Sequence, residues 1–243
     1  MNRLFEGCAA LDIDPQHTRD ELLQAVVSTI EANKMTDNVH IRLIVSRGLR
    51  ATPYQDPNVV VSPPTVVIIA EHKQPVPTTA THPLNLFTVH VRRGRPDVQD
   101  AGYNNLSKIN CITACIQANK AGADEALMLD PDGFVATCNS THFFIVRDGE
   151  VWTSTGVYCL DGITRGNVIK LCERNSIPVF QRTFSLTRVY GADEAFVTGT
   201  FAGVSPVGHV DGRKIGTGSR GPITHQLQQL YLALCENEGL KIS

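Results

Sequence analysis

The first strongly periodic segment of the chain is residues 18–33, which we expect to form an amphipathic helix. Its apolar positions follow a helical spacing, and they are Leu22, Leu23, Val26, Val27 and Ile30. Thr18 stands at the start of the segment and Glu21 follows three residues later, which is the spacing of a capping box. The pattern therefore predicts a helix that begins at Thr18.

Runs rich in β-branched residues follow this helix and predict strands. They cover residues 39–46, 65–71 and 86–92. The pair Pro63–Pro64 marks a loop before the second run, because proline cannot take part in the middle of a strand. The first part of the chain is thus expected to combine helix and strand in one α/β unit.

The pattern changes after residue 95, where a helix rich in small residues gives way to short strands. We expect helices over 105–121, 164–175 and 221–236, and strands over 125–129, 134–137, 143–147, 151–153 and 194–198. Hairpin-type turns fit Asp130–Gly133 and Arg147–Glu150. We predict two domains, an N-terminal α/β domain over 1–95 and a C-terminal domain over 96–243, joined near residues 93–102.

Composition and charge narrow the class of protein. The chain has 243 residues, 42% of them hydrophobic, and a formal net charge of −2, so no basic field favours nucleic acid. The basic cluster at 92–95 is interpreted as solvated loop. No apolar run is long enough for a transmembrane helix, and the first residues lack the apolar segment of a signal peptide. We expect neither nucleic acid nor membrane as a partner.

The seven cysteines form no C-x-x-C pair, and their spacing suits neither a zinc site nor a disulfide framework. Buried or half-buried thiols in a reducing compartment are the simpler interpretation. We therefore predict a cytoplasmic protein without a metal site.

Two short segments are candidates for holding a phosphate. Gly162-Ile163-Thr164-Arg165 precedes a predicted helix, and the first amides of a helix attract anions. A plain N-cap by Thr164 is the alternative. The second segment, Gly199–Ala202, follows a strand and is either a backbone nest for an anion or a simple strand-ending turn.

Read together, several segments of the chain resemble the fold-type IV, or class IV, pyridoxal-phosphate enzymes. These are the branched-chain and D-amino-acid aminotransferases and aminodeoxychorismate lyase. The resemblance covers residues 2–235 and is carried in order by 119–133, 139–146, Leu160–Arg165, 192–200 and 205–207. It implies an α/β (α+β) fold of two domains, pyridoxal 5'-phosphate as cofactor, and a homodimer.

The resemblance implies a role for each matching residue. Ile163, Thr164 and Thr200 match residues that hold the cofactor phosphate, and Leu160 matches the apolar residue beside the pyridine ring. Arg3 matches the arginine that pairs with the phosphate, and a guanidinium offers paired donors for that purpose.

Three further arginines match the substrate side of the family's site. Arg42 lies in a segment that resembles one lining this side in branched-chain enzymes. Arg47 and Arg50 fall near a loop where relatives hold a substrate carboxylate. For Arg47 and Arg50, surface charge is the alternative.

The chain departs from the family pattern at its start and at its expected lysine. The family begins earlier, so we expect an N-terminal domain that lacks its first strands. Aligned back from residues 118–122 without gaps, Asn104 takes the place of the lysine that carries the cofactor. Lys108 follows four residues later, roughly 6 Å of helical rise, and we expect it to take over the role. An ordinary surface lysine is the alternative.

A further departure is Thr137, which matches the carboxylate partner of the pyridine nitrogen. A hydroxyl carries no charge and stabilises a protonated ring less strongly. We nevertheless expect an aminotransferase that moves an amino group between an amino acid and a 2-oxo acid. The alternatives are a pyridoxal-phosphate-dependent lyase and a non-catalytic relative that keeps the pocket.

Overall fold

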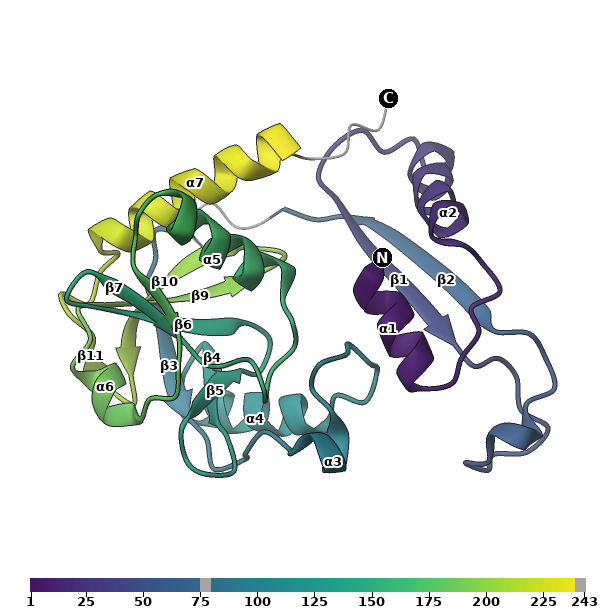
Figure 1. Cartoon of the computed structure of the whole chain (residues 1–243), viewed down its shortest axis with the longest axis horizontal. Helices are drawn as coiled ribbons and strands as arrows, with labels where there is room; N and C mark the ends of the chain where they lie inside the picture. The colour runs from purple at the N-terminus through teal and green to yellow at the C-terminus, as the bar shows by residue number, and fades with distance from the viewer. Residues whose placement is uncertain (75–79, 239–243) are drawn as a thin grey trace. The chain divides into compact units, whose positions relative to one another are not determined.

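The computed structural model of the protein describes residues 1–74 and 80–238 (Figure 1). They divide into two compact units, residues 1–74 and the described residues from 80 to 238. Both units mix helix and strand, which confirms the predicted α/β (α+β) class.

The first unit is a two-stranded antiparallel ribbon with helices. Its elements are α1 (Asn2–Ala10), α2 (Arg19–Ala32), β1 (Val39–Ser46), the 3-10 turn η1 (Pro57–Val59) and β2 (Thr65–His72). Strands β1 and β2 pair along their whole length, from Val39 opposite His72 to Ser46 opposite Thr65. The predicted capping box is confirmed, because Thr18 and Glu21 exchange side-chain and backbone hydrogen bonds at the start of α2.

The second unit is built on one mixed sheet with helices packed against it. In space its strands follow the order β5-β4-β3-β10-β9-β6-β7-β8, and β11 pairs with β10. The strands are β3 (Leu84–Thr88), β4 (Glu125–Leu129), β5 (Val135–Cys138), β6 (His142–Arg147), β7 (Glu150–Thr153), β8 (Val179–Gln181), β9 (Glu194–Gly199), β10 (Gly203–Val210) and β11 (Arg213–Lys214). The helices are α3 (Pro96–Gln99), α4 (Ile109–Lys120), α5 (Ile163–Arg174), α6 (Leu186–Tyr190) and α7 (Pro222–Glu238).

Strand β3 belongs to the second unit, although the sequence pattern placed it in the first domain. It runs parallel to both β4 and β10, with Leu86 opposite Glu125 on one side and Val210 on the other. The compact units therefore divide after Gln74, earlier than the predicted boundary at 95. The strand also begins two residues earlier than expected and ends at Thr88.

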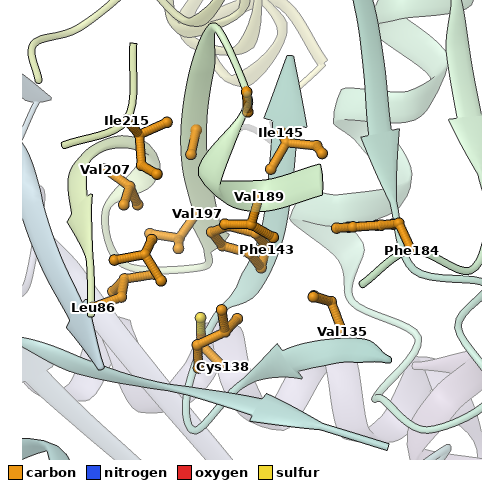
Figure 2. Packing of buried hydrophobic residues seen from close by; sticks show 14 of the residues in the cluster. Leu86, Val135, Cys138, Phe143, Ile145, Phe184, Val189, Val197, Val207 and Ile215 are labelled. Carbon is orange, nitrogen blue, oxygen red and sulfur yellow. The ribbon is translucent and has the colours of Figure 1, made fainter. Parts of the chain in front are cut away.

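Alternate residues of the central strands pack into separate cores on the two faces of the sheet. Phe143, Ile145 and Val197 contribute to the core shown in Figure 2, which Phe184 and Val189 cover. The opposite face carries another core, where α5 and α7 pack against the neighbouring residues of β6 and β9. There the rings of Phe144 and Phe196 stack with centroids 4.8 Å apart. In Figure 1, α5 and α7 are seen on the same side of this sheet.

The pentapeptide Gly-Ala-Asp-Glu-Ala occurs twice, at 122–126 and 191–195, and leads into β4 and β9. Both copies use their carboxylates in the same way, as acceptors for backbone amides of neighbouring segments. Asp124 accepts from the amide of Asn85, and Asp193 accepts from the amide of Asp148. Glu194 accepts from the amides of Ile223 and Thr224 and so fixes the start of α7. The carboxylates of the repeated motif thus join strands β4 and β9 to the segments beside them.

Glu125, the glutamate of the first copy, organises the turn between β5 and β6. Its buried carboxylate accepts hydrogen bonds from the amides and hydroxyls of Ser140 and Thr141, at 2.8–3.0 Å. Burial raises the pKa of this carboxyl, and the four hydrogen bonds act in the opposite direction. The backbone carbonyl of Thr141 in turn accepts from the hydroxyl of Thr137, 2.8 Å away. Glu125 therefore holds the segment that fixes Thr137.

Thr18→Ala is expected to loosen the start of α2, since loss of an N-cap hydroxyl costs about 1 kcal/mol. Hydrogen exchange of the first-turn amides should become about fivefold faster for the same reason. Thr29→Ala is the matched control, because this threonine lies inside the same helix and its hydroxyl donates to the carbonyl of Ala25. Equal exchange in the two variants would contradict the capping role.

Glu125→Gln should remove one contribution to the pH dependence of stability. Because the pKa is raised in the folded protein, this carboxyl stabilises the fold fully below the ordinary pKa of glutamate. That stabilisation is lost as the pH rises through the raised value, whereas glutamine keeps similar hydrogen bonds without titrating. Urea unfolding across this pH window should show a shallower fall for the variant, and Glu236→Gln, at an exposed position, should behave as the wild type.

Candidate functional site

A pocket of about 330 Å³ opens beside the N-terminus of α4. Its wall combines the loop after β3, the segment that leads into α4, the first turns of α4, and Leu160 from the loop before α5. The side chains that line the pocket include Arg93, Asn104, Lys108, Cys111 and Leu160. The structure thus brings the predicted lysine, the asparagine at its expected place and the predicted ring-packing leucine to one pocket.

Lys108 stands at the N-cap of α4, with its amine at the side chain of Asn104. The Lys108 Nζ donates to the Asn104 Oδ1 at 2.7 Å. The helix was predicted to begin at 105, but the Asn105 side chain accepts from the amide of Ser107 and closes a local turn. Such side-chain turns compete with helix formation, so α4 begins only at Ile109. The two candidate positions for the lysine are therefore adjacent in space.

Arg93 corrects the interpretation of residues 92–95 as a solvated cluster. Its guanidinium is half-buried and donates to the carbonyl of Tyr158 at 3.0 Å and to the Sγ of Cys111 at 3.3 Å. It thereby ties the loop around Leu160 to the first turns of α4. Cys159, beside Leu160, is buried, and burial raises the pKa of its thiol although Arg165 and Arg93 act against this.

The start of α5 is arranged as an open helix N-terminus. Gly162 is the N-cap residue and no side chain caps the helix, so the predicted alternative of a cap by Thr164 is wrong. Ile163 is 62% exposed, whereas Thr164 is 4% exposed. A Cβ at Gly162 would overlap the imidazole of His142 on β6, so only glycine allows this close approach. Uncapped first-turn amides of this kind are suited to an anion.

The turn between β9 and β10 carries the second predicted phosphate residue, Thr200, which is exposed. Gly199 and Gly203 pair across this turn. Tyr231 of α7 connects it with α5. Its hydroxyl lies 3.2 Å from the hydroxyl of Thr164, and a Cβ at Gly203 would lie 3.1 Å from its ring. Tyr231 therefore contacts Thr164 of the first predicted phosphate segment and lies beside Gly203, the residue that follows the second.

Thr137 lies on β5 and is buried, with its hydroxyl donating to the carbonyl of Thr141. It is not among the residues that line the pocket beside α4. Its hydroxyl oxygen keeps acceptor capacity, but the hydrogen is engaged within the β5–β6 turn.

The four predicted arginines of the first unit have different surroundings. Arg3 lies in the first turn of α1. Arg47 donates to the carbonyls of Leu11 and Asp12 and so closes the end of α1, and Arg50 donates to the carbonyl of Tyr54. Arg42 lies exposed on β1, where its backbone pairs with Ile69, and its guanidinium has no hydrogen-bond or ion-pair partner within the described residues.

Tyr231 and Arg93 were not identified as site residues from the sequence. Tyr231 lies 67 residues from Thr164 along the chain, and no local pattern connects them. Arg93 stands in a cluster of arginines that the sequence does not distinguish from one another. In the structure Arg93 is half-buried, whereas Arg92 and Arg95 are exposed. Its burial beside Cys111 depends on the fold.

Other classes of site find no support in the part of the chain that the structure describes. It contains no group of three or more His, Cys, Asp or Glu side chains that could hold a metal ion. None of its helices has the length and apolar character needed to cross a membrane. The seven cysteines are free thiols, as predicted, but Cys235 is exposed rather than buried or half-buried.

Comparisons with known proteins identify the family of the chain. A family model described as "Amino-transferase class IV" matches residues 1–210. The branched-chain-amino-acid aminotransferase-like protein 2 of Arabidopsis thaliana is 37% identical over all of the chain, which spans only 43% of that relative. A putative branched-chain-amino-acid aminotransferase of Methanocaldococcus jannaschii is 36% identical, and the chain spans 83% of it.

Among solved structures, the branched-chain amino acid aminotransferase of Thermobaculum terrenum, in its PLP-form, superposes with a TM-score of 0.86. It is 28% identical and covers 96% of the chain, which spans 76% of that structure. These relatives are all named as aminotransferases or aminotransferase-like proteins, so the lyase alternative is not favoured. With a family model that matches most of its length, the chain belongs to the class IV aminotransferase family.

Proposed function

We propose that the protein is a pyridoxal-phosphate-dependent aminotransferase that moves an amino group between an amino acid and a 2-oxo acid. The observation that carries this proposal is the 2.7 Å contact between the Lys108 amine and Asn104. In the family pattern Asn104 matches the lysine position, and the Lys108 amine lies at its side chain from four residues further along the chain. The functional amine is thus retained at the pocket that Leu160 also lines.

The start of α5 fits the phosphate of the cofactor. Its first amides are uncapped, and the nearby hydroxyl of Thr198 is fully buried without a hydrogen-bond partner in the described part of the chain. Thr198 pairs with His142 on β6, the residue against which Gly162 packs. We propose Ile163 and Thr164 as phosphate-holding residues of this helix start.

The remaining cofactor contacts are proposed from the family pattern. Thr200, exposed in the β9–β10 turn, would hold a phosphate oxygen together with Thr164. Arg3 of the first unit would supply a guanidinium to the same phosphate. Leu160 would pack beside the ring, and Thr137 would take the position of the ring-nitrogen partner with a neutral hydroxyl.

When bound, pyridoxal phosphate supplies an electron sink for the carbanion formed at the α-carbon of the amino acid. The chain supplies the proton transfer, for which we propose the Nζ of Lys108 as the group that accepts and returns the α-proton. Asn104 orients this amine through its Oδ1. Arg93 keeps the Leu160 loop against the first turns of α4, so that the leucine and the lysine share one pocket.

A branched-chain amino acid is the proposed substrate, because the relatives are named for that class. Its carboxylate needs a cation, and Arg42 is the arginine of the first unit whose donors are uncommitted within the described residues. Arg47 and Arg50 are the other candidates, although both donate to backbone carbonyls. A homodimer is proposed from the family pattern, and the free thiols support a reducing compartment such as the cytoplasm.

Reduction with borohydride in the presence of pyridoxal phosphate should attach the cofactor covalently to Lys108, and peptide mass mapping should locate it. Lys108→Ala should lose both this attachment and the conversion of a branched-chain amino acid to its 2-oxo acid. Lys120→Ala, a lysine in the last turn of the same helix, is the matched control and should keep both.

The same assay separates the competing functions. Repeated turnover of a branched-chain amino acid that requires an added 2-oxo acid acceptor supports transfer, because without an acceptor each site releases at most one equivalent of product. Repeated release of a 2-oxo acid without an acceptor, from an amino acid that carries a leaving group on its β-carbon, supports a lyase. A wild-type chain that takes up no cofactor and releases no product would overturn the proposal in favour of a non-catalytic relative.

A further inference from the structure

Tyr231 of α7 connects two parts of the proposed phosphate site. Its hydroxyl lies 3.2 Å from the Thr164 hydroxyl in the first turn of α5. Its ring contacts Gly203, where an added Cβ would lie 3.1 Å from two ring carbons. Gly203 pairs with Gly199 and closes the turn that carries Thr200. The tyrosine therefore fixes the α5 start and the β9–β10 turn relative to each other.

The hydrogen count of the two hydroxyls decides what the contact can do. Each hydroxyl has one hydrogen, so only one of them donates to the other. When Tyr231 donates, the hydrogen of Thr164 stays available for an acceptor at the start of α5. The acceptor favoured there is an anion, because the first-turn amides are uncapped and carry partial positive charge.

The surroundings of Tyr231 hold its hydroxyl in place beside Thr164. Its ring packs against the core that α5 and α7 share, which limits its movement. Burial raises the pKa of the phenol, the hydrogen bond with Thr164 lowers it, and the side chain of Cys235 raises it. The phenol keeps its hydrogen at neutral pH, and an anion that accepts from Thr164 leaves Tyr231 as the donor between the two hydroxyls.

We propose that Tyr231 is a positioning residue for the cofactor phosphate: it donates to Thr164 and directs the Thr164 hydrogen toward a phosphate oxygen. Its ring also holds the Thr200 turn beside that hydroxyl. The inference rests on the proposed function, since it names a residue of the same site. It concerns the phosphate group alone and predicts no contact with the ring of the cofactor.

Tyr231→Phe removes the hydroxyl and keeps the ring, so the fold should be retained. Loss of one hydrogen bond should raise the Kd for pyridoxal phosphate about threefold to tenfold. The affinity for pyridoxal, which lacks the phosphate, should not change. Tyr190→Phe is the matched control, because its hydroxyl bonds Asp211 and its ring packs against the core on the other face. Absorbance titration of the apoprotein measures these affinities.

A second comparison tests the route through Thr164. In a Thr164→Val background, Tyr231→Phe should cause no further loss of affinity for pyridoxal phosphate, because the hydroxyl that it positions is gone. An additional loss equal to that in the wild-type background would overturn the proposal. So would an unchanged Kd in Tyr231→Phe, or an equal loss of affinity for pyridoxal, which would indicate a general disturbance of the pocket.

Inorganic phosphate separates this inference from the proposed function. Stabilisation of the apoprotein by inorganic phosphate, measured as a shift in Tm, should be smaller in Tyr231→Phe than in the wild type. Failure of the wild type to bind pyridoxal phosphate would contradict the aminotransferase proposal. Equal phosphate shifts in the two proteins, including none in either, would overturn the role of Tyr231.

Discussion

The close approach of α5 to strand β6 depends on the absence of a side chain at residue 162. A Cβ there would overlap the imidazole of His142, which the sheet fixes opposite Thr198 through the β6–β9 pairing. Because the approach is close, the uncapped start of α5 lies directly over the strands, and α7 packs beside it on the same core. The contact of Tyr231 with Thr164 follows from this packing. In the second unit, the part of the proposed site that would hold the phosphate therefore depends on the packing of the Gly162 backbone against the side chain of His142.

Sequence patterns predicted the elements whose signals are local and failed where tertiary contacts overrule them. Strands β1 and β4 have the predicted bounds, because an apolar run between turns is a sufficient signal. Strand β10 was missed, since Gly203, Pro206 and Gly208 all argue against a strand. Pro206 lies opposite Phe196 of β9 and just before Val207, where the pairing of β10 with β3 begins. On the side of β10 that faces β3, the missing amide of Pro206 therefore interrupts no ladder.

The residues of the candidate site also divide into those that a local motif indicates and those that only the packed structure brings in. The resemblance to a known family implied roles for Leu160, Ile163, Thr164 and Thr200, because their motifs are short and keep their order along the chain. It carried no information on Tyr231, whose contact with Thr164 joins helices far apart in sequence. Sequence reasoning also treated Arg93 as one of several equivalent charges, although only the fold decides which guanidinium is covered. Burial and long-range hydrogen bonds are properties of the packed chain, so neighbouring residues of one type cannot be ranked before the packing is known.

Asn104 matches the family's lysine in the sequence, and the Lys108 amine lies close to it in space although the two residues are four positions apart. A lysine amine lies at the end of a four-carbon stem, so the position of the Nζ, rather than of the backbone, determines what it can reach. In this protein the Nζ of Lys108 meets the Oδ1 of Asn104, and the asparagine becomes an orienting acceptor where the family has the amine's own stem. Thr137, which matches the family's carboxylate in the sequence, is the larger departure, since its hydroxyl donates to the carbonyl of Thr141 and bonds no charged group within the described residues. In the proposed transfer, a ring without a charged partner withdraws electrons less strongly. More of the catalysis then depends on proton transfer at Lys108. The orientation that Asn104 gives to the Lys108 amine becomes correspondingly more important.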